Sequence, residues 1–263
     1  MPTATATSRP RFRAPRTIGA LILREMEATH GRSLLGYLWA VAEPVAGILL
    51  LTFIFSLAFH TPPLGTSFAF FYASGYLPFA AYLEVSQKVS QSIRFSRPLL
   101  FYPGVTFLDA ILARFLLAAM TQAMVAGVVL AAMVPLLGIR TLIDIPAVAG
   151  AMGLAMALAL GVGVLNCFLT EMVPAWERVW AILNRPLFIV SGVFFLFEAV
   201  PEPWRGWLWF NPLVHVIGQM RLGLYPAYDG AEVSAAYVLA LAGAALLAGL
   251  VLLGRYHRDL VNG

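Results

Sequence analysis

The residue types that most often carry catalysis or bind metal ions are few in this sequence, and they are scattered along it. The four histidines, His30, His60, His215 and His257, share no spacing that is typical of a metal site. No GxxxxGK[ST] loop is present to hold nucleotide phosphates, and neither GxSxG nor HExxH occurs. We therefore expect no catalytic residues, no metal and no other cofactor in this chain.

Ionisable residues within long apolar stretches are the next place to look for chemistry, because a charge is costly there unless it has a role. Glu43, Glu84 and Arg114 lie near the ends of such stretches, and Arg185 lies deeper in one. We favour a structural role for Glu43, beside the positive end of a helix, and expect Arg114 to extend to the membrane interface. Two interpretations of Arg185 stay open. It lines a water-filled path for an anionic substrate, or it extends to the cytosolic surface.

The elements that must position these residues are long apolar helices. The mean hydropathy is +0.83, and only 11% of the residues are charged, whereas soluble domains carry about 25% charged residues. We therefore predict an all-α integral membrane protein with six transmembrane helices. The predicted spans are 40–59, 68–87, 106–134, 145–169, 179–198 and 233–254. Residues 1–16 are predicted to be a disordered basic arm, and residues 17–263 a single transmembrane domain.

The stretch 24–44 combines charge with helical periodicity. It carries five charged residues, while 45–59 carries none. Apolar residues recur at helical spacing before and after Gly31, a natural end for a first helix and start for a second. This pattern predicts an N-terminal amphipathic helix that lies along the membrane surface and leads into the first span, with Pro44 in the first turn of that span.

Local patterns refine three of the predicted spans. Thr106, with Asp109 three residues later, predicts a capping box at the start of the third span. Pro186 removes a helix hydrogen bond and predicts a break within the fifth span. In the fourth span, small residues recur every fourth position and predict a close helix–helix contact. They are Ala149, Gly153, Ala157 and Gly161.

The distribution of basic residues predicts the orientation. Six spans place both termini on one side, and the positive-inside rule favours the cytosolic side for the more basic face. That face would carry the first six arginines, Lys88, Arg94, Arg97, Arg178, Arg255 and Arg258, against Arg140, Arg205 and Arg221 opposite. We expect the basic arm to contact anionic lipid headgroups, and we expect no nucleic-acid partner.

Four segments, in order, resemble a known family. They are HGRSLLGYLWAVAEP, RPLLFYPGVTFLDAILAR, NRPLFIVSGVFF and WFNPLVHVIGQMRLGLYP. Together they resemble the permease subunit of type-2 ABC exporters, in particular the capsular-polysaccharide and O-antigen exporters, from about Thr17 to the C-terminus. The second segment favours lipid-linked capsular polysaccharide over O-antigen. Teichoic acid, drugs and, in another class, a membrane-embedded acyl- or glycosyltransferase stay open as alternatives.

The resemblance implies an assembly in the bacterial inner membrane. Two copies of the permease would pair with two copies of a separate cytosolic ABC ATPase, which would bind ATP and magnesium. It leaves open periplasmic and outer-membrane export proteins as further partners.

The resemblance also implies two sites. Residues 93–104 match the cytosolic coupling helix, with the predicted ATPase contacts Arg94, Phe95, Arg97, Leu100, Phe101 and Tyr102. Residues 199–227 match the re-entrant helices of an outer gate before the last span. The predicted gate residues are Trp204, Trp207, Trp209, Asn211, His215 and Arg221.

Aromatic residues suggest where a polysaccharide would pass. Pyranose rings present flat C–H faces, on which aromatic rings can stack, much as aromatic side chains hold single-stranded nucleic acid. Tryptophans between 204 and 209 also suit an interfacial belt, which leaves the deeper phenylalanines as the better candidates. We therefore predict that the fifth span lines the path at the axis of a dimer. The predicted path residues are Arg185, Phe188, Ser191, Phe194 and Phe195.

Overall fold

The computed structural model describes residues 13–30, 34–100 and 105–262, and every regular element in these ranges is helical. The all-α prediction is therefore confirmed. The α-helices are α1 (Arg13–His30), α2 (Leu34–Ala58), α3 (Phe68–Ser90), α4 (Ser92–Leu100), α5 (Phe107–Leu136), α6 (Ile145–Met172), α7 (Trp176–Val190), α8 (Trp204–Leu208), α9 (Pro212–Leu224) and α10 (Ala235–Asn262), with the short 3-10 helix η1 (Phe197–Ala199) after α7.

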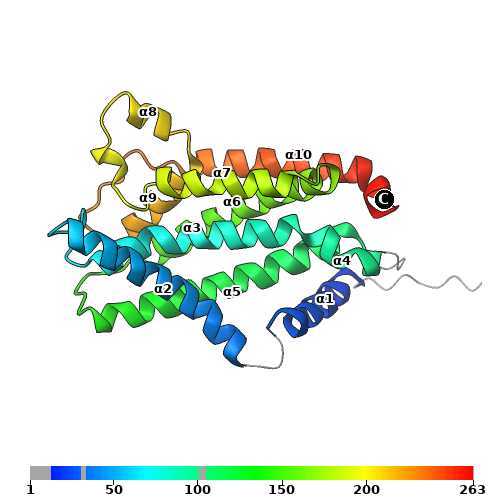
Figure 1. Ribbon diagram of the computed structural model, residues 1–263, viewed down its shortest axis with the longest axis horizontal. Helices are drawn as coiled ribbons and strands as arrows, with labels where there is room; N and C mark the ends of the chain where they lie inside the picture. The colour runs from blue at the N-terminus through cyan, green and yellow to red at the C-terminus, as the bar shows by residue number, and fades with distance from the viewer. Residues whose placement is uncertain (1–12, 31–33, 101–104, 263) are drawn as a thin grey trace, which may run out of the picture.

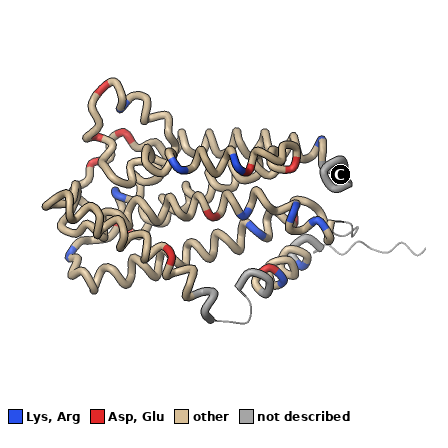
Figure 2. The backbone as a smooth tube through the Cα atoms, in the orientation of Figure 1, with Lys and Arg blue, Asp and Glu red and all other residues tan. Residues whose placement is uncertain are grey.

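The long helices form one elongated bundle. Helices α3, α5, α6, α7 and α10 run along its length, and α2 crosses obliquely near one end (Figure 1). That end also carries α8 and α9, while α1, α4 and the C-terminal end of α10 lie at the opposite end. Figure 2 shows basic residues gathered on α1, α4 and the adjoining ends of α3, α5 and α7. The two ends of the bundle therefore differ in charge, as expected for a protein that lies across a membrane.

Four of the described helices are long and apolar enough to cross a membrane, namely α2, α5, α6 and α10. Helix α3 has 23 residues, but its second half carries Glu84, Gln87 and Lys88. Helix α7 has 15 residues, which gives about 22 Å at 1.5 Å per residue and falls short of the roughly 30 Å hydrocarbon core. Among the described residues four of the six predicted spans therefore meet these criteria, and the six-span arrangement stays a prediction for α3 and α7.

The first span begins earlier than predicted. Helix α1 ends at His30, next to the predicted break, but α2 already begins at Leu34 and runs through Pro44 without interruption. Pro44 therefore lies well inside the helix rather than in its first turn. Glu43 is accordingly not at a helix N-terminus, and it lines a cavity of about 200 Å³ between α2, α3 and α5. Helix α1 begins at Arg13, inside the stretch predicted as a disordered arm.

Helix α6 lies at the centre of the bundle and packs against α3, α9 and α10. Its start is capped by Asp144, whose side chain accepts a hydrogen bond from the Ala147 N–H. Of the predicted stripe of small residues, Gly161 makes the close approach and lies directly against the carbonyl of Ala242 in α10. Ala149 and Gly153 are exposed, and no neighbouring atom lies within 4 Å of a Cβ built at Gly153, so the prediction was wrong there. Gly249 in α10 makes a second close contact with α6, since a Cβ there would lie 2.7 Å from the main-chain nitrogen of Leu165. Both glycines are needed for α6 and α10 to pack this closely.

Helix termini follow the local sequence at α5 but not at α7. The predicted capping box is confirmed, with Thr106 and Asp109 bonding each other's main-chain N–H. The predicted break at Pro186 was wrong, because α7 continues through this proline to Val190. The helix ends instead where Gly192 adopts a φ of +82°, a conformation that favours glycine.

Candidate binding cleft and the charged contacts at its end

A cleft of about 790 Å³ lies between α3, α6 and α7. Aliphatic, aromatic, charged and neutral polar side chains line it. Aromatic rings come from Tyr76, Phe79, Trp180 and Phe188, and charged groups come from Glu177, Arg178 and Arg185. The neutral polar groups belong to Ser86, Gln87, Ser90, Gln91, Asn166, Thr170 and Asn184. The volume falls within the about 300–1,000 Å³ that is usual for ligand sites, and the lining offers both flat apolar faces and hydrogen-bonding groups.

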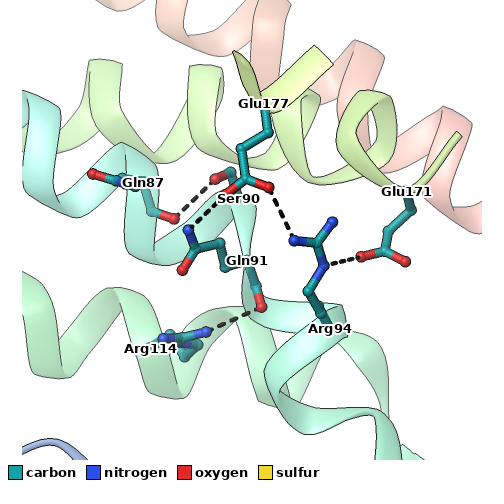
Figure 3. Close-up of polar contacts among 7 residues, drawn as sticks. All are labelled: Gln87, Ser90, Gln91, Arg94, Arg114, Glu171 and Glu177. Atoms are coloured by element: carbon teal, nitrogen blue, oxygen red, sulfur yellow. Dashed lines mark hydrogen bonds and ion pairs between the residues drawn. The ribbon is translucent and has the colours of Figure 1, made fainter. Parts of the chain in front are cut away.

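Charged contacts join α4 to the start of α7 at one end of this cleft (Figure 3). Arg94 Nη1 donates to Glu177 Oε2 at 2.9 Å, and its Nε lies 3.8 Å from Glu171 Oε1. Gln91 Nε2 donates to the other oxygen of Glu177 at 3.3 Å. Glu177 therefore holds the end of α3, the short helix α4 and the start of α7 together.

Arg114 in α5 is the centre of a second, buried set of contacts. Its Nε lies 2.7 Å from Glu25 Oε1 in α1, and both side chains are buried. Nη1 donates to the main-chain carbonyl of Gln91 at 3.0 Å, and the guanidinium lies 4.3 Å from the centre of the Phe95 ring. The prediction that Arg114 extends to the interface was wrong, because Glu25 provides a carboxylate within the protein.

The predicted ATPase contacts divide into three groups. Phe95 and Arg94 are exposed on α4, and Leu100 packs partly buried against the core. Arg97 is partly buried and makes contacts within the chain. Phe101 and Tyr102 lie outside the described residues.

Of the five predicted path residues, Arg185 and Phe188 line the cleft. Arg185 is exposed, and no carboxylate pairs with it among the described residues. Ser191 is buried, and its hydroxyl donates to the Leu187 carbonyl and accepts from Asn211 Nδ2. Phe194 packs on Phe188. Phe195 is partly buried, and its carbonyl accepts a hydrogen bond from Arg221.

The predicted gate residues lie together at the end of the bundle that carries α8 and α9 (Figure 1). Trp204 and Trp207 are exposed on α8. Trp209 packs against His215, whose Nε2 lies 2.8 Å from the Trp209 carbonyl. Because His215 Nδ1 accepts from the Ser234 N–H, Nε2 carries the proton. Burial lowers the pKa of His215, which agrees with a neutral ring.

Arg221 and Asn211 connect α9 to the end of α7. Arg221 is fully buried in α9 and donates to the carbonyls of Gly192, Val193 and Phe195. Burial lowers the pKa of the Arg221 guanidinium to about 10, so that it stays charged at neutral pH. Asn211 caps α9 and also donates to Ser191 Oγ. The segment that follows α7 is therefore held by α9.

Sequence reasoning missed Glu25, Glu177 and Asn166 as members of these sites. Among the described residues no group of three or more His, Cys, Asp or Glu side chains could hold a metal ion. The cleft itself offers aromatic rings and hydrogen-bonding side chains to a ligand.

Comparison with known proteins identifies relatives along nearly the whole chain. The pattern of the family described as "ABC-2 type transporter" matches residues 16–225. The polysialic acid transport protein KpsM of Escherichia coli is 30% identical over 237 residues, which cover 90% of this chain and 92% of KpsM. The capsule polysaccharide export inner-membrane proteins CtrC of Neisseria meningitidis serogroup A and BexB of Haemophilus influenzae are 28% and 26% identical. They cover 92% and 93% of this chain and 92% of their own length.

Proposed function

Because the chain belongs to the ABC-2 type transporter family, we propose that it is the transmembrane subunit of an exporter for lipid-linked capsular polysaccharide. One observation carries this proposal. Three relatives whose names give them polysaccharide transport or export align over 90% or more of this chain. The two named CtrC and BexB are inner-membrane proteins, and we place this chain in the bacterial inner membrane as well.

In this proposal both termini are cytosolic, and α3 and α7 complete a set of six spans with α2, α5, α6 and α10. The charge distribution supports this orientation, because the basic residues of α1 and α4 lie at the end that would face the cytosol. Because α7 is short, the fifth span would consist of α7 together with the segment after it, which α9 holds. Helices α8 and α9 would then form the outer gate.

The energy would come from a separate cytosolic ATPase that binds ATP and magnesium. Helix α4 is the proposed docking element, because it lies at the basic end of the bundle and exposes Phe95 and Arg94. Aromatic and arginine side chains of this kind often carry much of the energy of a protein interface. Since Arg94 also contacts Glu177 in α7, displacement of α4 by the ATPase would act on a helix that lines the cleft.

Deletion of the gene tests the proposed function. Cells without it should make polysaccharide, lose it from the surface and accumulate it inside the inner membrane. Plasmid-borne wild-type chain should return the polymer to the surface. The measurement is antibody or lectin staining of intact and of permeabilised cells. Unchanged surface polymer in the deletion strain would contradict the proposal.

Charge reversal tests the contact between α4 and α7. Arg94→Glu would place a third carboxylate beside Glu171 and Glu177, so export should fall strongly. Because the Arg94–Glu177 pair is exposed, stability should change by less than about 1 kcal/mol. Combining Arg94→Glu with Glu177→Arg restores one attractive pair and should recover part of the export. Equal export by the wild type, by Arg94→Glu alone and by Glu177→Arg alone would show that the Arg94–Glu177 contact is not needed for export.

A further inference from the structure

Two buried amides in the cleft each have a polar atom without a partner. Asn166 in α6 and Asn184 in α7 are 3% and 8% exposed, and both line the cleft. Asn166 Nδ2 and Asn184 Oδ1 are buried, with no hydrogen-bond partner among the described residues. A buried polar atom without a partner is unfavourable, and such atoms are uncommon in folded proteins.

In each amide the bonded atom has a partner that fixes which atom is oxygen and which is nitrogen, and this identifies the free atom. Asn166 Oδ1 accepts from the indole N–H of Trp176 at 2.9 Å, and an indole nitrogen can only donate. Asn184 Nδ2 donates to the Trp180 carbonyl at 2.9 Å, and a carbonyl can only accept. Exchanging oxygen and nitrogen in either amide would place two donors or two acceptors together. One free donor on α6 and one free acceptor on α7 therefore belong to residues that line the cleft.

This combination selects the chemistry of a ligand. A carboxylate or phosphate only accepts hydrogen bonds, and an ammonium group only donates, so either would leave one amide unsatisfied. A hydroxyl group does both. Neighbouring hydroxyl groups on a sugar ring could accept from Asn166 Nδ2 and donate to Asn184 Oδ1.

The apolar part of the cleft suits the same ligand. Trp180 and Phe188 from α7 lie in it together with Tyr76 and Phe79 from α3. Phe79 and Phe188 have ring centres 4.9 Å apart and ring planes tilted by 60°, so α3 and α7 meet through these two rings. Aromatic rings beside hydrogen-bonding side chains can hold a sugar by its C–H face and its hydroxyl groups at once. Water molecules could hydrogen-bond to the two free amide atoms, but they would gain no stacking contact with the aromatic rings.

We propose that the cleft between α3, α6 and α7 is a glycan-binding site in which Asn166 and Asn184 bind uncharged sugar hydroxyl groups. This inference rests on the proposed export function and adds to it the place and chemistry of substrate contact. In this site the two amides bind uncharged hydroxyl groups, so binding does not require the polymer to be acidic.

Photocrosslinking in exporting cells tests the site. p-Azidophenylalanine replaces Ala181, which lines the cleft, or Leu247, which is 66% exposed on α10 and serves as the control. After illumination, carbohydrate bound to the purified chain is detected by periodate oxidation and labelling with biotin hydrazide. We expect carbohydrate on the chain with the probe at 181 and none with the probe at 247.

Two variants of the amides make the test specific. Asn184→Leu removes the free acceptor, while the Trp180 carbonyl keeps its helix hydrogen bond. Asn166→Asp keeps the acceptor for Trp176 and removes the free donor. Each should reduce capture at position 181 and export by about threefold to tenfold, the usual effect of one lost hydrogen bond. Thr121→Val, which removes a hydroxyl bonded to its own helix in α5, should change neither. Co-purification with the ATPase checks that each variant is folded.

The outcomes separate the site from the function. Export by wild type with no capture at 181, or capture and export that neither amide variant reduces, would overturn the site and leave the proposed function standing. Failure of the wild-type gene to restore export to the deletion strain would overturn the function itself. Equal capture at 181 and 247 would also overturn the site, because the probe would then report only proximity to membrane glycolipid.

Discussion

Replacing Glu25 with alanine should lower the melting temperature of the purified protein by on the order of 10 °C. Glu25 and Arg114 form a buried ion pair, with 2.7 Å between Oε1 and Nε. Removing the carboxylate leaves a buried guanidinium without a counter-charge, which typically costs about 3–5 kcal/mol. Because this pair joins α1 to α5, the loss should also release α1 from the bundle. Fluorescence-detected size-exclusion chromatography after heating measures both the stability and the folded fraction.

A matched control variant and a double variant test whether the unpaired charge of Arg114 causes the loss of stability. Glu202→Ala removes a carboxylate from the exposed Arg205–Glu202 pair, where such pairs contribute about 0–1 kcal/mol, and should leave the melting temperature almost unchanged. Glu25→Leu combined with Arg114→Met replaces both charges with apolar groups and should recover most of the lost stability. A melting temperature that is equally low in the double variant would mean that Arg114 needs α1 for packing rather than for charge.

Much of the fold could be predicted from the sequence, because apolar periodicity and helix caps are local signals. The capping box at Thr106 and Asp109 and the end of α1 beside Gly31 needed only neighbouring residues. The predictions were wrong where helix boundaries were placed at prolines from the local sequence alone. Pro44 lies inside α2 rather than in its first turn, and Pro186 does not break α7, which ends just before Gly192 with its positive φ.

The candidate site could be predicted only in part, because its decisive contacts join residues that are distant in sequence. Glu25 and Arg114 are separated by 89 positions, and Arg94 and Glu177 by 83. Nothing in the sequence around Asn166 distinguishes it from an ordinary polar residue in a helix. A weak signal did exist for Glu25 and Glu177, since each lies directly beside an arginine, Arg24 and Arg178 respectively. Pairing them with Arg114 and Arg94 required the fold.

Helix α7 is poorly covered by the rest of the bundle. Of its 15 residues only Asn184 is buried. One face exposes Val179, Ile182, Leu183, Ile189 and Val190, and another carries Arg178 and Arg185 beside the cleft. Lipid could cover the apolar residues, but a helix with two exposed arginines is poorly suited to a lipid environment. A second copy of the chain would cover the apolar face and enclose the polar one, which favours α7 at the axis of the proposed dimer.

Cysteine crosslinking between two copies should therefore trap the exporter. Ile182 is 63% exposed and Ile189 59%, and they lie two turns apart on one face of α7. With Cys167→Ala removing the chain's one cysteine, Ile182→Cys or Ile189→Cys should form a disulfide-linked dimer under oxidation. Since a disulfide requires the two Cα atoms to approach within about 7 Å, its formation would place the two α7 helices side by side. Export should stop on oxidation and resume after reduction. Leu247→Cys on the exposed face of α10 should give no dimer, and dimers from Leu247→Cys alone would place α10 at the axis instead.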